Sequence, residues 1–145
     1  MKIFVEQDES IQETEVVLRC HAIDDETASI ITNLRMHDMK VVGTIDHEYQ
    51  SVPARDILFA DSVDGRTFIY TTNTVLETAL RLYKLEERLA SSGFVRVAKN
   101  CLVNLNRIST FRPYVGGRLL ASLDNGEDLV ISRKYAPKIK ALLLI

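Results

Sequence analysis

The sequence has only two cysteines, no tryptophan and no long apolar run among its 145 residues. Two cysteines, Cys20 and Cys101, are too few for a disulfide framework, so we expect both thiols to be reduced. No stretch approaches the roughly 20 apolar residues of a membrane-spanning helix, and the opening MKIFVEQDES lacks the apolar region of a signal peptide. These absences predict a cytoplasmic globular protein that folds without covalent cross-links.

Motifs typical of enzymes and metal sites are also missing. The three histidines, His21, His37 and His47, stand on separate predicted elements, and none has a second ligand at a spacing that suits a metal ion. There is no serine elbow and no glycine-rich phosphate loop. The acidic pair Asp24-Asp25 is similar to that of a phospho-receiver, but too little chain follows for a receiver, and helix capping explains the pair better. We therefore expect no enzyme activity, no metal, no cofactor and no small-molecule substrate.

The charge is distributed unevenly along a chain whose formal net charge is only −2. Residues 1–50 hold 4 Lys/Arg and 11 Asp/Glu, a net charge of −7, whereas residues 51–145 hold 14 and 9, a net charge of +5. A basic surface suits a polyanion such as nucleic acid, although strands with a solvated face also carry Lys and Arg. The charge pattern therefore favours nucleic-acid binding by the second part without requiring it.

Residues 1–46 are expected to form a small α/β unit. We predict strands at residues 1–7 and 13–23, a helix that starts at Asp24-Asp25-Glu26, and a strand at residues 40–45. Three short strands and one helix cannot bury their own apolar faces, so this unit is expected to form a homodimer. The alternatives are that it packs on the rest of its own chain or binds another protein.

Residues 51–145 are expected to be mainly β, after an acidic connector, DHEYQ. Asp64-Gly65 predicts a hairpin turn, a helix is expected from Thr74 to a stop at Gly93, and Asn125-Gly126 predicts a second turn. Between these, FVRVAKNCLVNLNRI predicts two strands that meet at a polar corner. Strands are expected on both sides of Gly116-Gly117, and a short helix, YAPKIKALLLI, is expected to close the chain.

Three segments in order carry a resemblance to a known family: DILFADSVDGRTFIYT, GFVRVAKNCLVNLNRIS and GGRLLASLDNGEDLVISRKYAPKIK. Over residues 51–145 the chain resembles the LytTR family of bacterial DNA-binding domains, whose pattern is matched at Phe94, Arg96, Val103 and Asn104. The second match is Ile131 to Tyr135, which is similar to the closing strand-to-helix signature of the family. The resemblance implies an elongated antiparallel β fold with short helices.

The resemblance also implies sequence-specific binding of double-stranded promoter DNA at repeated sites, with loops rather than a helix set into successive major grooves. By matching position, the contacting loops would offer the following residues: Arg66, Lys99, Asn100, Arg133 and Lys134. The chain departs from the common pattern at Ala98, Lys99 and Cys101, so the preferred DNA sequence cannot be carried over. Family members that lack a receiver domain are often restrained by a small membrane protein, which implies such an inhibitor as a partner.

Two polar residues of the family pattern have readings other than DNA contact. The Asn104 amide is expected to bond the backbone of a turn rather than a base. Arg96 could contact DNA or serve as a buried ion-pair partner. The sequence as a whole predicts a transcriptional regulator, and the alternative is a protein interaction module of a membrane-associated regulatory system. Binding of single-stranded RNA would need exposed aromatic residues. Phe59, Phe68 and Phe94 occupy core-like strand positions, and Tyr114, beside Gly116-Gly117, is the one aromatic residue for which exposure is left open.

Overall fold

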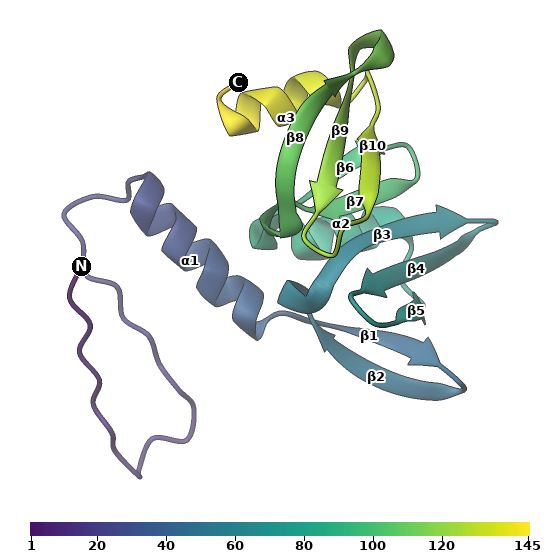
Figure 1. The fold of residues 1–145 in the computed structure, drawn as a ribbon. Coiled ribbons are helices and arrows are strands. Elements are labelled where there is room, and N and C mark those ends of the chain that lie inside the picture. Colours follow the sequence, from purple (N-terminus) through teal and green to yellow (C-terminus); the bar gives the residue numbers. More distant parts are fainter.

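The computed structural model describes all 145 residues, and its fold is mainly antiparallel β with three α-helices, as predicted. The strands form one seven-stranded sheet in the order β2-β1-β5-β4-β3-β7-β6 and one three-stranded sheet in the order β10-β9-β8. Figure 1 shows the smaller sheet above β6 and β7, with α3 beside it and α1 projecting from the opposite end of the domain. None of the helices has the length and apolar character needed to cross a lipid bilayer.

The seven-stranded sheet contains the following strands: β1 (Lys40–Ile45), β2 (Glu48–Pro53), β3 (Ile57–Val63), β4 (Arg66–Thr71), β5 (Val75–Thr78), β6 (Phe94–Ala98) and β7 (Cys101–Asn104). The smaller sheet contains β8 (Ile108–Tyr114), β9 (Arg118–Leu123) and β10 (Asp128–Ile131). The helices are α1 (Asp25–Asp38), α2 (Leu82–Leu89) and α3 (Ala136–Leu143). Four 3-10 turns, at Ala54–Asp56, Ala90–Ser92, Leu105–Arg107 and Val115–Gly117, connect these elements.

Two apolar clusters form the core. The first joins α2 to the larger sheet through the buried residues Leu82, Leu85 and Leu89, which follow one another at helical spacing and face Ile69 and Phe94. The second lies between the β6–β7 end of the larger sheet and the smaller sheet, and α3 contributes Ala136 and Ile139 to it. Phe94 is buried as predicted. These clusters fix the two sheets and the loops between them as one body.

The turn predictions are confirmed. Asp64 and Gly65 adopt φ angles of 52° and 75°, and they connect β3 to β4 in a two-residue hairpin. The Lys99-Asn100 corner connects β6 to β7, and Gly93 ends the segment after α2 with φ 85°. The helix at Asp24-Asp25-Glu26 is also confirmed, since the Asp24 carboxylate accepts the Thr27 N–H as an N-cap.

The strand predictions for residues 1–7 and 13–23 were wrong. These residues form an arm without regular secondary structure, which runs in a wide loop away from the sheets (Figure 1). A strand needs a neighbour to accept its backbone hydrogen bonds, and none of the strands of this chain pairs with the arm. Alternating apolar residues alone therefore do not suffice for a strand here.

Two further segments differ from expectation. Residues 75–78 form β5 rather than the start of a helix, because Leu76 and Thr78 alternate into the core and the segment pairs with β4. The expected connector DHEYQ turns at Asp46-His47 and continues into β2, which pairs with β1 along its whole length. Through Thr44 and Glu77, β1 also pairs with β5. The hairpin of β1 and β2 is therefore part of the larger sheet.

Candidate nucleic-acid interface

Three loops that carry the predicted contact residues are connected by backbone hydrogen bonds. The carbonyl of Asn100, in the β6–β7 corner, accepts the N–H of Ser62 near the end of β3 at 2.9 Å. The carbonyl of Val97, just before the same corner, accepts the N–H of Ser132 in the β10–α3 loop, also at 2.9 Å. The corner therefore lies between the β3–β4 hairpin and the β10–α3 loop, and the structure brings the three predicted loops together.

The β6–β7 corner presents Lys99 and Asn100 to solvent. Both residues are exposed, and neither side chain makes a hydrogen bond or an ion pair within the chain. The backbone below them is fixed by Arg96, whose Nη1 donates to the Lys99 carbonyl at 2.6 Å. The two side chains are thus exposed donors without partners, on a backbone that Arg96 holds by a hydrogen bond, which suits contact with an external polyanion.

Arg96 itself has a structural role. Its Nη2 lies 3.2 Å from the Glu86 carboxylate on α2, and its side chain is only 16% exposed. The guanidinium therefore connects β6, α2 and the β6–β7 corner. Of the two readings that the sequence left open, the ion-pair partner is the one found.

The β10–α3 loop presents Arg133 and Lys134, which are both exposed. Gly117 of the β8–β9 turn supports the Arg133 side chain: a Cβ atom at Gly117 would lie 3.2 Å from Arg133 Cγ. Lys134 lies over the Tyr135 ring, with 5.5 Å between Nζ and the ring centroid. The Arg133 stem therefore lies against Gly117 and the Lys134 ammonium over the Tyr135 ring, while neither cation has an ion-pair partner in the chain.

Arg66, at the start of β4, differs from the other predicted contact residues because it is already paired. Its Nε and Nη2 donate to the two carboxylate oxygens of Glu77 on β5, at 2.9 and 2.6 Å. The pairing raises the pKa of the Arg66 guanidinium and, through the hydrogen bonds from Arg66, lowers the pKa of the Glu77 carboxyl. The two N–H groups of Nη1 and the second N–H of Nη2 remain free to bind another group.

Asn104 is buried and satisfied within the protein, as predicted. Its Nδ2 donates to the Ile57 carbonyl at 3.0 Å, and its Oδ1 accepts the Asn106 N–H at 3.0 Å. The side chain thereby joins the end of β7 to the start of β3. Asn104 therefore maintains the register of the two strands that carry the loops, rather than facing a ligand.

Sequence reasoning missed one basic residue beside these loops, Arg118. Its guanidinium lies 4.8 Å from the centroid of the Tyr114 ring, and its Nε donates to the Val115 carbonyl at 2.8 Å. It flanks the same turn as Gly117, on which Arg133 lies. The signal in the sequence is a double glycine placed between a tyrosine and an arginine, which marks a tight turn with a cation at its base.

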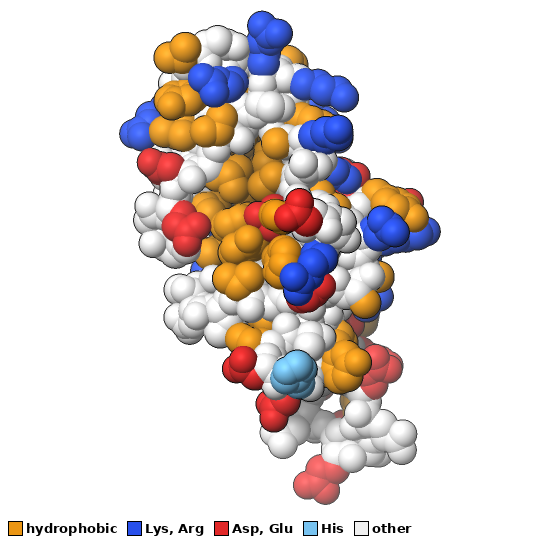
Figure 2. All heavy atoms as spheres, turned by 90° about the vertical axis from the view of Figure 1, so that its right-hand side faces the viewer, with side chains coloured by type: hydrophobic (Ala, Val, Ile, Leu, Met, Phe, Trp, Pro, Cys, Tyr) orange, Lys and Arg blue, Asp and Glu red, His pale blue; other side chains and the backbone are white.

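A basic region and a more acidic region share the face toward which the β3–β4 hairpin points. Figure 2 shows Lys and Arg side chains gathered around the upper part of this face and Asp and Glu more frequent in the lower part. Four cations in the last part of the chain are exposed and have no ion-pair partner within it: Arg133, Lys134, Lys138 and Lys140. Residues 1–38, in contrast, carry 3 Lys/Arg against 9 Asp/Glu, a net charge of −6.

Cys101, the first residue of β7, is not a reactive thiol. Burial, together with the nearby Asp61 carboxylate, raises its pKa to about 12. The thiolate, which is the nucleophilic form, is therefore scarce at neutral pH. The side chain acts as a small apolar residue in the cluster below the β6–β7 corner.

Comparisons with known proteins agree with this fold. The family profile of the LytTr DNA-binding domain matches residues 47–144. Curated relatives include the sensory transduction protein LytT of Bacillus anthracis, 28% identical over 106 residues, which are 73% of this chain and 43% of the relative. The transcriptional regulatory protein LytR of Staphylococcus aureus (strain MW2) is 27% identical over 122 residues, which are 83% of this chain and 50% of the relative. The chain thus spans about half the length of these relatives.

A solved structure shares the same architecture. It is a LytTr DNA-binding domain from Bacillus cereus, with a TM-score of 0.68 and 25% sequence identity. The similarity covers 72% of this chain and 95% of that domain. The resemblance inferred from the three sequence segments is thereby confirmed: the chain belongs to the LytTr DNA-binding domain family.

Proposed function

We propose that this protein is a transcriptional regulator that binds double-stranded promoter DNA through its β3–β4, β6–β7 and β10–α3 loops. The observation that carries the proposal is the connection of these three loops by the Ser62 and Ser132 hydrogen bonds, beside exposed donors that have no partner in the chain. Membership of the LytTr DNA-binding domain family supports it. Among the relatives, LytR is named a transcriptional regulatory protein.

In this proposal the loops enter successive major grooves, and each side chain has a role set by its chemistry. Arg133 and Asn100 can form paired hydrogen bonds with base edges, because a guanidinium fits guanine and an amide fits adenine. Lys99 and Lys134 contact phosphates and fix the orientation of the domain. Arg66 keeps its pair with Glu77 and offers the N–H groups of Nη1 and the second N–H of Nη2, so we assign it a contact with a phosphate.

The protein is further proposed to act as two copies on a repeated DNA site. Two domains held together raise the effective concentration of the second domain once the first is bound. Residues 1–38, with a net charge of −6, are repelled by DNA, so association through this part of the chain leaves the basic loops free.

The alternative function is a protein interaction module, and one observation favours it. The arm exposes several large apolar residues, among them Ile3, Phe4 and Val5 with 80%, 86% and 87% of their surface accessible. Such a surface also suits the membrane-protein inhibitor that the family resemblance implies. The two functions are compatible, since the arm and the three loops are separate parts of the chain.

A gel-shift experiment tests the proposal. The full chain is titrated against promoter fragments from upstream of its own coding sequence, with scrambled duplex and single-stranded RNA as competitors. We expect one fragment to be retained in the presence of either competitor. Equal competition by scrambled duplex at physiological salt would contradict sequence-specific regulation, and preferential competition by RNA would replace the duplex with RNA as the ligand.

A further inference from the structure

The N-terminal arm, residues 1–23, has the composition of strands but no strand to pair with. Ile3 and Val5 alternate with Lys2 and Phe4, so that in an extended chain they share one face. Apart from a turn closed by the Ile11 N–H on the Asp8 carbonyl at 3.2 Å, the arm makes no backbone hydrogen bond within the chain. The strand-forming residues therefore have unused pairing capacity.

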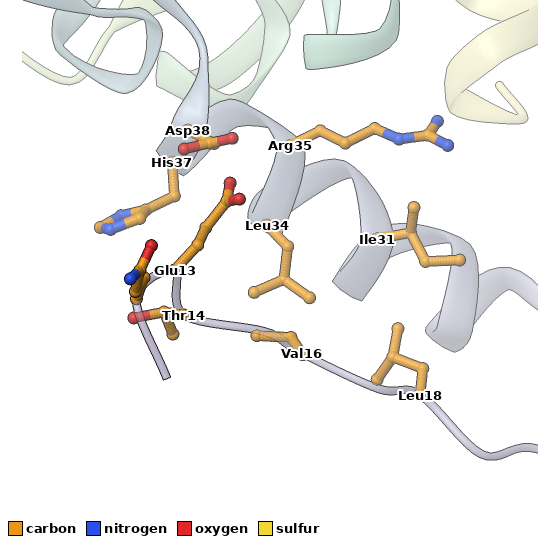
Figure 3. A pocket seen from close by; sticks show the side chains of 10 residues that line it. Glu13, Thr14, Val16, Leu18, Ile31, Leu34, Arg35, His37 and Asp38 are labelled. Atoms are coloured by element: carbon orange, nitrogen blue, oxygen red, sulfur yellow. The ribbon is translucent and has the colours of Figure 1, made fainter. Parts of the chain in front are cut away.

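Beside this arm lies a groove of about 880 Å³ between residues 12–18 and α1. Figure 3 shows Val16 and Leu18 of the arm on one side of the groove and Ile31 and Leu34 of α1 on the other. Glu13, His37 and Asp38 lie at one end of the groove. The floor is therefore aliphatic, and one end is polar and acidic.

Helix α1 packs against the rest of the domain only at its C-terminal end, so its side of the groove has no packing partner. Only Met36, in its last turn, is buried, and the contacts that hold it to the domain are also at that end: Arg55 Nη1 donates to His37 Nδ1 at 3.0 Å. The helix has 14 residues, and isolated helices of about 12–15 residues are marginal in water. The apolar side of its first three turns needs a second surface to pack against.

We propose that residues 1–7 of a second copy fill this groove, and that two copies exchange their N-terminal segments reciprocally to form a dimer. The segment would add to residues 12–18 as a neighbouring strand, with Ile3 and Val5 against the aliphatic floor. A reciprocal exchange is closed by a two-fold axis, so it stops at two copies. Strand addition also provides the neighbour whose absence leaves the arm irregular in the single chain.

The apolar area that the exchange would bury is on the scale of a small dimer interface. The exposed apolar side chains that face the contact are Ile3, Val5, Val16, Leu18 and Leu34. At roughly 60 to 120 Å² per apolar side chain, they would remove on the order of 300 to 600 Å² per copy, to which the backbone of the added strand contributes further, against about 800 Å² per partner in a standard interface. The like charges of the two arms oppose association, but salt at about 0.15 M screens exposed charges beyond about 8 Å.

This inference deepens the two-copy arrangement proposed above and rests on the proposed function only for its consequence at a repeated DNA site. The dimer itself is measured without DNA. Failure of the exchange would leave binding of one copy to a half-site intact, whereas failure of the DNA proposal would leave the dimer intact.

The experiment uses sedimentation of the full chain and two double variants. Ile3→Asp/Val5→Asp breaks the inserted segment, and Val16→Asp/Leu18→Asp breaks the groove. We expect a dimer for the unmodified chain at tens of micromolar and monomers for each double variant. Leu142→Asp, at an exposed position of α3, is the matched control and should remain dimeric.

Mixing the two double variants tests the reciprocity directly. One variant retains an intact groove and the other an intact segment, so the mixture can form one of the two exchanges and should contain a heterodimer. A monomeric unmodified chain, a dimer that survives both pairs of substitutions, or a mixture without heterodimer would each overturn the proposal. Because every substituted side chain is exposed or partly exposed in the single chain, the circular dichroism of the variants should match that of the unmodified protein.

Discussion

Arg96 and Glu86 form an ion pair at 3.2 Å that joins β6 to α2, and the same guanidinium donates to the Lys99 carbonyl at 2.6 Å. The β6–β7 corner therefore owes its shape to a residue that is not itself presented to solvent. This arrangement separates side chains that support the proposed interface from those that would contact DNA, and the two groups should respond differently to substitution.

Substitution of Arg96 should lower stability and DNA affinity together. Arg96→Ala removes a charge-assisted hydrogen bond to the corner and leaves Glu86 unpaired, which should cost on the order of 1 to 3 kcal/mol in the free energy of unfolding. Arg96→Lys keeps the charge but not the planar fork and should recover only part of the loss. Urea denaturation measures the effect, and an unchanged midpoint combined with lost DNA binding would make Arg96 a DNA contact instead.

Lys99→Ala and Lys134→Ala should lower DNA affinity without lowering stability. Each should cost on the order of 1 to 3 kcal/mol of DNA affinity and lower the steepness of the salt dependence by about one phosphate contact, with an unchanged melting temperature. Lys84→Ala, which removes an exposed lysine from α2, is the matched control and should bind DNA as the unmodified protein does. If the first two variants bind as tightly as the control, the interface has been placed on the wrong loops.

Two adjacent glycines allow a test of Arg133. Gly116 and Gly117 have φ angles of 75° and 76°, so alanine is strained at either position by about 1 to 2 kcal/mol. Only at Gly117 would the added Cβ atom contact Arg133; at Gly116 nothing lies within 4 Å. We expect Gly117→Ala to weaken DNA binding about three- to tenfold beyond Gly116→Ala, by displacing Arg133. Fluorescence anisotropy would measure both, and equal affinities would show that the position of Arg133 is unimportant.

Cys101 should make the protein less stable at alkaline pH. The unfolded chain ionises this thiol above its ordinary pKa of 9.0, whereas the folded protein keeps it neutral up to a pKa of about 12. Its contribution is therefore complete below pH 9 and is lost as the pH rises from 9 to 12. Between pH 8 and 11, the unfolding free energy of Cys101→Ala should fall by about 2 to 3 kcal/mol less than that of the unmodified protein. Cys20→Ala, at an exposed position, is the control, and its unfolding free energy should change with pH as that of the unmodified protein does. If Cys101→Ala gives the same pH dependence as the unmodified protein, burial of the neutral Cys101 thiol does not contribute to stability.

The sequence predicted the elements whose structure is set locally. The hairpin at Asp64-Gly65 and the corner at Lys99-Asn100 follow from turn chemistry and flanking strand formers, and both are found. The helix expected from Thr74 failed at residues 75–78, because pairing with β4 is a non-local contact that helical spacing of leucines does not report. Residues 1–7 and 13–23 failed for the same kind of reason, since a strand depends on a neighbour.

The same distinction between local and non-local contacts decides which features of the candidate site could be predicted. The backbone role of Asn104 could be predicted because an amide at the end of a strand commonly satisfies a turn. The ion pair of Arg66 could not, because Glu77 is 11 residues away and meets Arg66 only through the pairing of β4 with β5. Whether a surface arginine is free or paired thus depends on strand register, which the sequence leaves open.

The dependence of DNA affinity on salt tests the central claim most directly. A specific promoter duplex and a scrambled duplex are titrated with the full chain at several salt concentrations. If each protomer neutralises about 4 to 6 phosphates, log affinity should fall with log salt at a slope of about −4 to −5 per protomer, with the specific duplex bound more tightly throughout. A flat response, or equal affinity for the two duplexes at physiological salt, would contradict the account.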